Sequence, residues 1–512
     1  MSERTDVTVE PPWWKTAVVY QIYPRSFADS TADGVGDLQG IRAHLDHLEW
    51  LGVDAIWLSP FFTSPMADFG YDVADYCDVD PIFGTLADFD RLLADAHARG
   101  IKVLIDWVPN HSSDRHPWFV ESRSSRDNPK RDWYIWRDGT PDQMPNNWSA
   151  AFGGKVWTWD EGTEQWYLHL FLPEQPDLNW RNPEVVAAMH DTLRFWLDRG
   201  VDGFRMDVIH GIVKREDLVD LPVDRHHSPD RFDEPAVHAH LRDIRTLIDG
   251  YPGDRTSVGE VYILSTGKVA EYYGQGDELH MAFNFPPLYA PWDAAAWRKR
   301  VDRVVEELDP RDAWPTWVLS NHDNPRHRSR YGSEARARAA AVLLLTLRGT
   351  PFLYAGEELG LEDAVIPKDR EVDPAGRDIC RAPIPWTPAS DHGWGVDDPW
   401  LPWPPEPDVR NVESLRADET SILHLYRRIL AARHASPALQ AGTWAPLPSP
   451  PTVLAYSRVL GDDRRIVLVN FGDAPVSVSL ESAAVVEVAS DGAGEGAAFT
   501  GTLAADSAVI LR

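Results

Sequence analysis

Charged and imidazole side chains stand at the ends of apolar segments along this 512-residue chain. The stretch VDGFRMDVIH (201–210) carries Arg205 and Asp207 two residues apart. Side chains alternate along a strand, so both would point to one face while Phe204 and Met206 point to the other. Three more apolar segments run into DWVPNH (106–111), GEVY (259–262) and SNHD (320–323).

Three carboxylates, those of Asp207, Glu260 and Asp323, would converge if these segments were parallel strands ending at one rim of a barrel. Carboxylates repel each other, so a protein gathers them for metal binding or acid–base chemistry, or with cations among them. The candidate cations or hydrogen-bond donors are Arg205, His111 and His322. Each residue alone fits a helix cap or a turn, but their recurrence at matching strand ends favours a site.

The surroundings of two of these acids predict different protonation states. Arg205 is expected to keep Asp207 ionised, as a nucleophile requires. Glu260 stands beside Val258 and Val261, where burial would favour the protonated form that a general acid needs. Glycoside hydrolysis uses one ionised and one protonated carboxyl.

The elements that must position these residues are eight short apolar segments with helical periodicity between several of them. Unbroken apolar strands are typical of a parallel sheet buried on both faces, and the alternation predicts an α/β fold, a (β/α)8 TIM barrel. Helices are expected over 85–100 and 183–200, each ending at a glycine. The expected strands are 17–24, 53–60, 101–109, 201–208, 256–262, 279–285, 316–323 and 349–358.

Two connections are too long for simple crossovers. Residues 110–182 predict a subdomain inserted after the third strand, and residues 361–410, rich in Pro, Asp and Trp, predict a functional loop or lid. Short strands divided by Gly-Asp turns follow, so 438–512 is predicted to be a C-terminal all-β domain, a β-sandwich. The barrel would then comprise 1–109 and 183–437.

The composition limits the classes of partner. The formal net charge is −30, which repels nucleic acid and anionic membranes. Two cysteines at unrelated positions form neither a disulfide framework nor a zinc pattern. We expect a cytoplasmic protein without a membrane partner, because the N-terminal residues lack a signal-peptide apolar core and the longest apolar run is too short to span a bilayer.

At these residues the chain resembles the α-amylase superfamily of glycoside hydrolases, and within it the α-glucosidase and oligo-1,6-glucosidase branch. DWVPNH, QPDLN (175–179), GFRMD, GEVY and SNHD occur in the family's order, and the resemblance spans nearly the whole chain. It implies that Asp207 is the nucleophile and Glu260 the acid and then the base. Asp323 would hold sugar hydroxyls and favour the transition state, with net retention of the α-anomer.

The resemblance also implies a glucose pocket. Asp68 and Tyr71 would line it, with Tyr71 as a stacking platform. His111, Arg205 and His322 would bond the sugar or the nucleophile, and Phe152, Phe171 and Gln175 would form or adjoin the wall. Arg381, in GRDICRAPIPW, would close the pocket by pairing with Asp68, although Ile384 and Pro385 replace the usual Met-Gln.

The same branch carries a metal loop, which corresponds here to DSTADGVGD (29–37). The resemblance predicts a structural Ca²⁺, or Mg²⁺, because these are hard oxygen donors at alternating positions. The alternative is a solvated acidic turn, and no organic cofactor is expected. The expected ligands are Asp29, Thr31, Asp33, Asp37 and the carbonyl of Val35.

The long inserts would convert an open cleft into a pocket that admits only a chain end. We therefore expect an exo-acting α-glucosidase for short oligosaccharides or disaccharides, acting as a monomer or homodimer. Alternatives are a sucrose or maltose isomerase of the trehalose-synthase type, a dedicated α-glucosyltransferase and, more remotely, a non-catalytic transporter-associated homologue. Val208 after the nucleophile favours α-1,6 linkages, and both α-1,4 and α-1,6 stay open.

Overall fold

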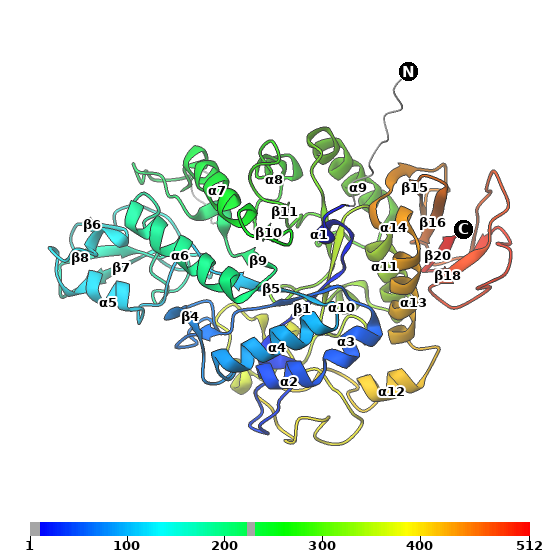
Figure 1. Cartoon of the computed structure of the whole chain (residues 1–512), viewed down its shortest axis with the longest axis horizontal. Coiled ribbons are helices and arrows are strands. Elements are labelled where there is room, and N and C mark those ends of the chain that lie inside the picture. Colours follow the sequence, from blue (N-terminus) through cyan, green and yellow to red (C-terminus); the bar gives the residue numbers. More distant parts are fainter. Residues whose placement is uncertain (1–10, 223–230) are drawn as a thin grey trace.

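Residues 11–222 and 231–512 are described by the computed structural model of this chain. Eight parallel strands form one sheet at its centre (Figure 1), in the order β11-β10-β9-β5-β2-β1-β13-β12. Each lies inside a segment predicted to be a strand, so the (β/α)8 fold class is confirmed. The strands are β1 (Val19–Ile22), β2 (Ala55–Leu58), β5 (Lys102–Trp107), β9 (Gly203–Met206), β10 (Thr256–Gly259), β11 (Met281–Ala282), β12 (Thr316–Val318) and β13 (Thr350–Tyr354).

Side-chain hydrogen bonds link the two end strands of this order. The hydroxyl of Thr316, the first residue of β12, donates to the carbonyl of Ala282 in β11 at 2.9 Å. The same oxygen accepts from the amide of Asn284 at 3.3 Å. These contacts bring β11 beside β12, so the carboxyl ends of all eight strands face one rim.

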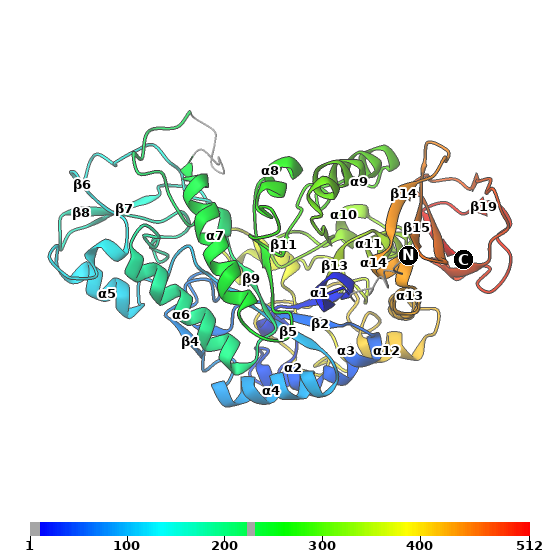
Figure 2. The ribbon, with the colours of Figure 1, turned by 45° about the horizontal axis from the view of Figure 1, so that its top comes forward.

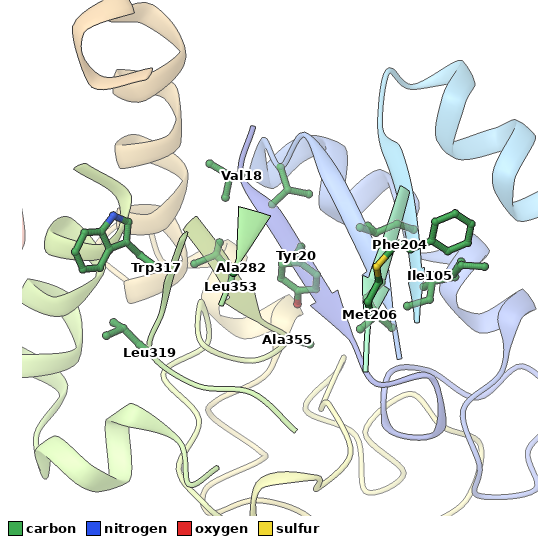
Figure 3. Close-up of a cluster of buried hydrophobic side chains, with 14 of the residues drawn as sticks. Val18, Tyr20, Ile105, Phe204, Met206, Ala282, Trp317, Leu319, Leu353 and Ala355 are labelled. Carbon is green, nitrogen blue, oxygen red and sulfur yellow. The ribbon is translucent and has the colours of Figure 1, made fainter. Parts of the chain in front are cut away.

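Alternate residues of the strands pack on opposite faces of the sheet. Val19, Trp57, Leu104 and Val258 belong to a buried cluster inside the ring of strands. Their neighbours face the surrounding helices (Figure 3), which explains why the strands are apolar throughout. The outward residues include Tyr20, Ile105, Phe204, Met206 and Leu353.

Helices follow most strands and cover the sheet. Both predicted helices are confirmed as α4 (Leu86–Ala98) and α6 (Pro183–Arg199). Thr85 and Asp88 form a capping box that begins α4, and Gly200, with φ of 104°, ends α6. The other helices of this region are α1 (Trp13–Thr16), α2 (Leu38–Ala43), α3 (Leu45–Leu51), α7 (Glu234–Asp249), α8 (Thr266–Glu271), α9 (Ala294–Leu308), α10 (His327–Tyr331), α11 (Glu334–Thr346), α12 (Val412–Ala417) and α13 (Ile422–Ala435).

The predicted insertion, 110–182, contains helix α5 (Pro117–Ser124) and a three-stranded antiparallel sheet, seen at the left of Figure 1. Its strands are β6 (Trp136–Asp138), β7 (Trp157–Asp160) and β8 (Gln165–Leu168). A small sheet of β3 (Phe62–Thr63) and β4 (Asp75–Val79) follows β2. Residues 361–410 hold only two short 3₁₀ turns, Lys368–Arg370 and Arg377–Cys380.

After α14 (Pro437–Ala441) the chain forms antiparallel β structure. Five strands pair in the order β14-β15-β16-β20-β18, and β17 pairs with β19. Ile466 and Leu468 of the large sheet share an apolar cluster with Leu503 of the small one, as expected of a sandwich. The strands are β14 (Thr443–Pro446), β15 (Val453–Leu460), β16 (Asp463–Asn470), β17 (Val476–Ser477), β18 (Val486–Ala489), β19 (Thr502–Leu503) and β20 (Ser507–Leu511).

Across the described residues, no helix combines the length and hydrophobicity needed to cross a membrane. The cytoplasmic location, the oligomeric state and the domain boundaries given above stay predictions.

Candidate active site

Arg205 is the centre of the carboxylate cluster. It lies between the outward-facing Phe204 and Met206 and therefore points into the barrel, where it is 2% exposed. Its Nη1 donates to Asp106 Oδ1 and to Asp207 Oδ1, both at 2.7 Å. Its Nη2 lies 2.8 Å from Glu260 Oε2. One guanidinium thus holds three carboxylates from the ends of β5, β9 and β10.

The backbone after β9 fixes Asp207 relative to Glu260. The amide of Asp207 donates to the carbonyl of Trp107 in β5 at 2.9 Å. Val208 follows with φ of 43°, a conformation that is rare for a β-branched residue. This turn directs the amide of Val208 to Glu260 Oε2 at 3.0 Å. A strained residue between two functional acids is typical of a site held in one geometry.

The electrostatics of Asp207 differ from the prediction. Burial raises the pKa of the Asp207 carboxyl well above its ordinary value; Arg205 opposes that shift, and Glu260 and Asp106 reinforce it. Burial also raises the pKa of Asp106 to about 6. Arg205 therefore acts on the pKa of Asp207 in the predicted direction, but burial outweighs it, and Arg205 is shared among three acids.

The surroundings of Glu260 are more polar than its sequence neighbours suggest. Its Oε2 accepts from both Arg205 and the amide of Val208, so that oxygen lies among donors rather than apolar groups. The neighbouring valines are buried against other parts of the barrel. The sequence pattern described the strand correctly but not the turn after it.

Asp323 lies beside two arginines and a histidine. Its Oδ1 accepts from Arg377 Nη1 and Arg381 Nη2, each at 3.1 Å, and its Oδ2 is 3.3 Å from His322 Nε2. Although burial acts to raise it, these neighbours hold the pKa of Asp323 below its ordinary value. Asp323 is therefore a fixed negative charge facing the cavity.

The predicted pairing of Asp68 with Arg381 is wrong, because the partner of Asp68 is Arg377. Arg377 Nη2 lies 2.5 Å from Asp68 Oδ1, and Gln175 Nε2 donates to Asp68 Oδ2 at 3.0 Å. Arg381 instead donates to the carbonyl of His322 at 2.7 Å and to Asp323. The two arginines flank one short 3₁₀ turn, and the N-terminal one reaches Asp68.

The histidines act as neutral hydrogen-bonding groups. Burial lowers the pKa of His111 to about 3 and that of His322 to about 3. His322 Nε2 lies 2.6 Å from the hydroxyl of Tyr71, and the two rings stack at 5.5 Å. His111 Nε2 lies 3.1 Å from the carbonyl of Tyr71. Both imidazoles therefore buttress Tyr71, which faces the cavity.

A cavity of about 290 Å³ joins these groups. This is the low end of the range for ligand pockets, roughly 300 Å³, and suits a small sugar. Four predicted site residues lie behind its wall: Gln175, Arg205, His322 and Arg381. The predicted residues that line it are Asp68, Tyr71, His111, Phe152, Phe171, Asp207, Glu260 and Asp323.

Several lining residues were missed by the sequence reasoning. Arg377 was overlooked although it stands in the same motif as Arg381, and Tyr262 although it ends the motif GEVY. Phe232 and Phe285 carry no polar marker that would have singled them out. The other lining residues are Ala151, Leu170, Val208, His210, Arg231, Asn321, Asn324 and Ala375.

Hydrogen bonds within the predicted metal loop join its own residues. The expected ligands there are Asp29, Thr31, Asp33, Val35 and Asp37. The amide of Thr31 donates to Asp29 at 2.8 Å and that of Val35 to Asp33 at 2.9 Å, while Asp37 caps α2. In the described part of the chain, no group of three or more His, Cys, Asp or Glu is placed to share a metal ion. Calcium or magnesium here stays a prediction; a Ca²⁺-dependent rise in the melting temperature of EDTA-treated protein would support it.

Comparisons with known proteins find relatives over most of the chain. The family model described as the alpha amylase catalytic domain matches residues 21–442. A probable alpha-glucosidase of Rhizobium meliloti (strain 1021) is 44% identical, with 92% of each chain covered. An oligo-1,6-glucosidase of Parageobacillus thermoglucosidasius is 39% identical, with 91% of each chain covered.

Solved structures are also similar over the whole chain. The alpha-glucosyl transfer enzyme XgtA has a TM-score of 0.91 at 42% identity, with 98% of this chain and 100% of that chain covered. The trehalulose synthase MutB from Pseudomonas mesoacidophila MX-45 has a TM-score of 0.92 at 34% identity, with the same coverage. The relatives thus include proteins named for hydrolysis, for transfer and for synthesis of a sugar.

Proposed function

Because the chain belongs to the alpha-amylase family of glycoside hydrolases, we propose that it is a retaining, exo-acting α-glucosidase. It would remove terminal non-reducing α-linked glucose from short α-glucosides. The observation that carries this proposal is the pair of acids, Asp207 and Glu260, bonded to neighbouring nitrogens of one guanidinium at the wall of a small cavity.

The reaction would proceed by two displacements. The carboxylate of Asp207 attacks the anomeric carbon while Glu260 gives a proton to the glycosidic oxygen, which leaves with the electron pair of the broken bond. Glu260 then takes a proton from water, and the water oxygen displaces Asp207. Both attacks invert the anomeric carbon, so the released glucose keeps the α configuration.

The polar end of the cavity supports recognition of a terminal sugar. Asp68, Arg377 and Asp323 form a bonded chain of alternating charge there. Such groups bond vicinal hydroxyls, and interactions that tighten as the ring flattens lower the barrier. If these side chains hold the terminal glucose, only a chain terminus would place its glycosidic bond between Asp207 and Glu260.

Transfer and isomerisation use the same first displacement and differ in what accepts the glucosyl group. The similarity to XgtA and MutB favours transglucosylation or isomerisation as the second candidate. A non-catalytic homologue is set aside, because every relative described above is named as an enzyme. Val208 and the similarity to an oligo-1,6-glucosidase favour α-1,6 linkages, with α-1,4 linkages as an additional class.

A product-resolved assay tests the proposal. The protein is incubated with maltose, isomaltose, sucrose and trehalose, and all products are identified by chromatography and NMR. We expect two glucose molecules for each maltose or isomaltose consumed, whereas transfer would release one glucose and build a longer oligosaccharide. Conversion of a disaccharide into an isomer, with little free glucose, would contradict hydrolysis and favour the second candidate.

A further inference from the structure

Tyr289 is an aromatic residue at the rim of the cavity that the proposed reaction does not use. It belongs to the loop between β11 and α9, two elements labelled in Figure 2, and 42% of it is exposed. Its hydroxyl donates to Asn324 Oδ1 at 2.9 Å and lies 2.7 Å from the hydroxyl of Tyr262. Tyr262 and Asn324 line the cavity, whereas Tyr289 stands just beyond its lining.

These two contacts fix the ring of Tyr289 and occupy its hydroxyl. Tyr289 gives its only proton to Asn324, so the proton between the tyrosines comes from Tyr262. The hydroxyl therefore acts as a tether rather than as a free donor. Among residues 11–222 and 231–512, no aromatic ring packs against that of Tyr289, which leaves a held, exposed aromatic surface.

The position of Tyr262 shows which side of the reacting bond this ring lies on. The general acid must face the leaving oxygen, so the leaving group lies on the side of Glu260. Tyr262 follows Glu260 by two residues, and its ring packs 5.1 Å from that of Phe285. The opposite end, with Asp68 and Arg377, would hold the terminal glucose.

A sugar chain that leaves the cavity on the side of Glu260 and Tyr262 would meet Tyr289. The second unit would lie beside Tyr262 and Phe285, which line the cavity. The third unit would then lie at the rim. Apolar faces of sugar rings stack on aromatic rings that keep little conformational freedom, which is the state of Tyr289.

We propose that Tyr289 is the stacking platform for the third glucosyl unit of the substrate, two units beyond the terminal glucose on the leaving-group side. This inference rests on the proposed function, because it assumes an α-linked glucose chain in the cavity. According to this proposal, Tyr289 is the residue that makes the protein bind trisaccharides more tightly than disaccharides.

Binding measured without turnover tests the platform. In an Asp207→Asn background, calorimetry gives Kd for isomaltose and isomaltotriose, and for maltose and maltotriose. We expect the trisaccharide of the preferred linkage to bind about fivefold more tightly than the disaccharide. Adding Tyr289→Ala should abolish that advantage, whereas adding Tyr289→Phe, which keeps the ring, should preserve it within about twofold.

A control variant and the two substitutions of Tyr289 together distinguish stacking on the ring from an effect of its hydroxyl. Leu460→Ala, which truncates a 45% exposed apolar residue in the C-terminal sheet, is the control and should leave the ratio unchanged. If the trisaccharide kept its advantage in the Tyr289→Ala variant, the proposal would be overturned. It would also be overturned if Tyr289→Phe removed the advantage as fully as Tyr289→Ala, because the effect would then belong to the hydroxyl tether. Failure of the wild-type protein to release glucose would instead overturn the proposed function, because the binding ratio does not depend on turnover.

Discussion

Arg377 bonds Asp68 with one guanidinium nitrogen and Asp323 with the other, at 2.5 and 3.1 Å. Asp68 comes from the loop between β3 and β4, Asp323 from the loop after β12, and Arg377 from the segment 361–410. The irregular segment thus contributes directly to the cavity. A planar, forked cation joins two acids that would otherwise repel each other across the sugar-binding end.

Replacing this fork tests its role. We expect Arg377→Lys to raise KM for α-glucosides by at least about tenfold, because an ammonium cannot bridge two carboxylates in that geometry. Arg370→Lys is the matched control, since Arg370 lies in the same segment and pairs with Asp398 at the surface. Steady-state kinetics of both variants would contradict the assignment if Arg377→Lys changed KM no more than the control.

Asp106 is expected to set the acid limb of activity through Asp207. The nucleophile must be ionised, and its pKa is raised by burial and by neighbours that include Asp106. Activity is therefore lost as pH falls through a value above the ordinary aspartate range of about 3.9. Asp106→Asn removes one raising charge and frees Arg205 for Asp207, so the acid limb of kcat/KM should move to lower pH. An acid limb that stays at the same pH or moves to higher pH would contradict this electrostatic account. Asp191→Asn, at an exposed position, is the control.

The loss of rate on replacing Glu260 is expected to depend on how much the leaving group needs a proton. Glu260→Gln should lower glucose release from maltose or isomaltose by roughly a thousandfold, because their leaving alcohols need a proton. The first step on an α-glucoside of an acidic phenol should fall far less, since that leaving group departs unprotonated. Burst kinetics measure this step, and an equal loss on both substrates would remove Glu260 from the acid role.

Glu357 predicts a pH dependence of stability that is separate from catalysis. It is 2% exposed, and burial raises its pKa to about 8. The folded protein keeps this proton while the unfolded chain releases it at about pH 4.3, so stability falls as pH rises between these values. Glu357→Gln has no proton to lose, and its melting temperature relative to wild type should increase from about pH 5 to about pH 8.

The exposed Glu362→Gln is the control for that measurement, since its side chain is 38% accessible. It should shift the melting temperature equally at both pH values. A difference between Glu357→Gln and wild type that is constant across this range would show that Glu357 is ionised in the folded protein.

The sequence located the strands and the catalytic candidates because both are local. Alternating side chains placed Arg205 opposite Phe204 and Met206, and that orientation is observed. The carboxyl ends of parallel strands then bring Asp207, Glu260 and Asp323 to one rim without further information. The helices 85–100 and 183–200 carried their own start and stop residues.

What the sequence could not supply depends on packing between distant segments. Whether Arg377 or Arg381 reaches Asp68 is decided by how residues 361–410 approach the rim, and both arginines flank the same short turn. The direction of the pKa shift of Asp207 depends on depth of burial, which outweighs the partner next to it. Phe232 and Phe285 enter the cavity from loops whose course no local pattern fixes.

The anomeric configuration of the first glucose released tests the central claim most directly. ¹H NMR in the first minutes of hydrolysis of an aryl α-glucoside, whose leaving group is not a sugar, resolves the two anomeric signals of glucose before mutarotation. Two displacements through Asp207 predict that α-glucose appears first and β-glucose grows in only as the anomers equilibrate. If β-glucose were the initial product, a single displacement by water would be operating, and Asp207 and Glu260 could not have the roles proposed for them.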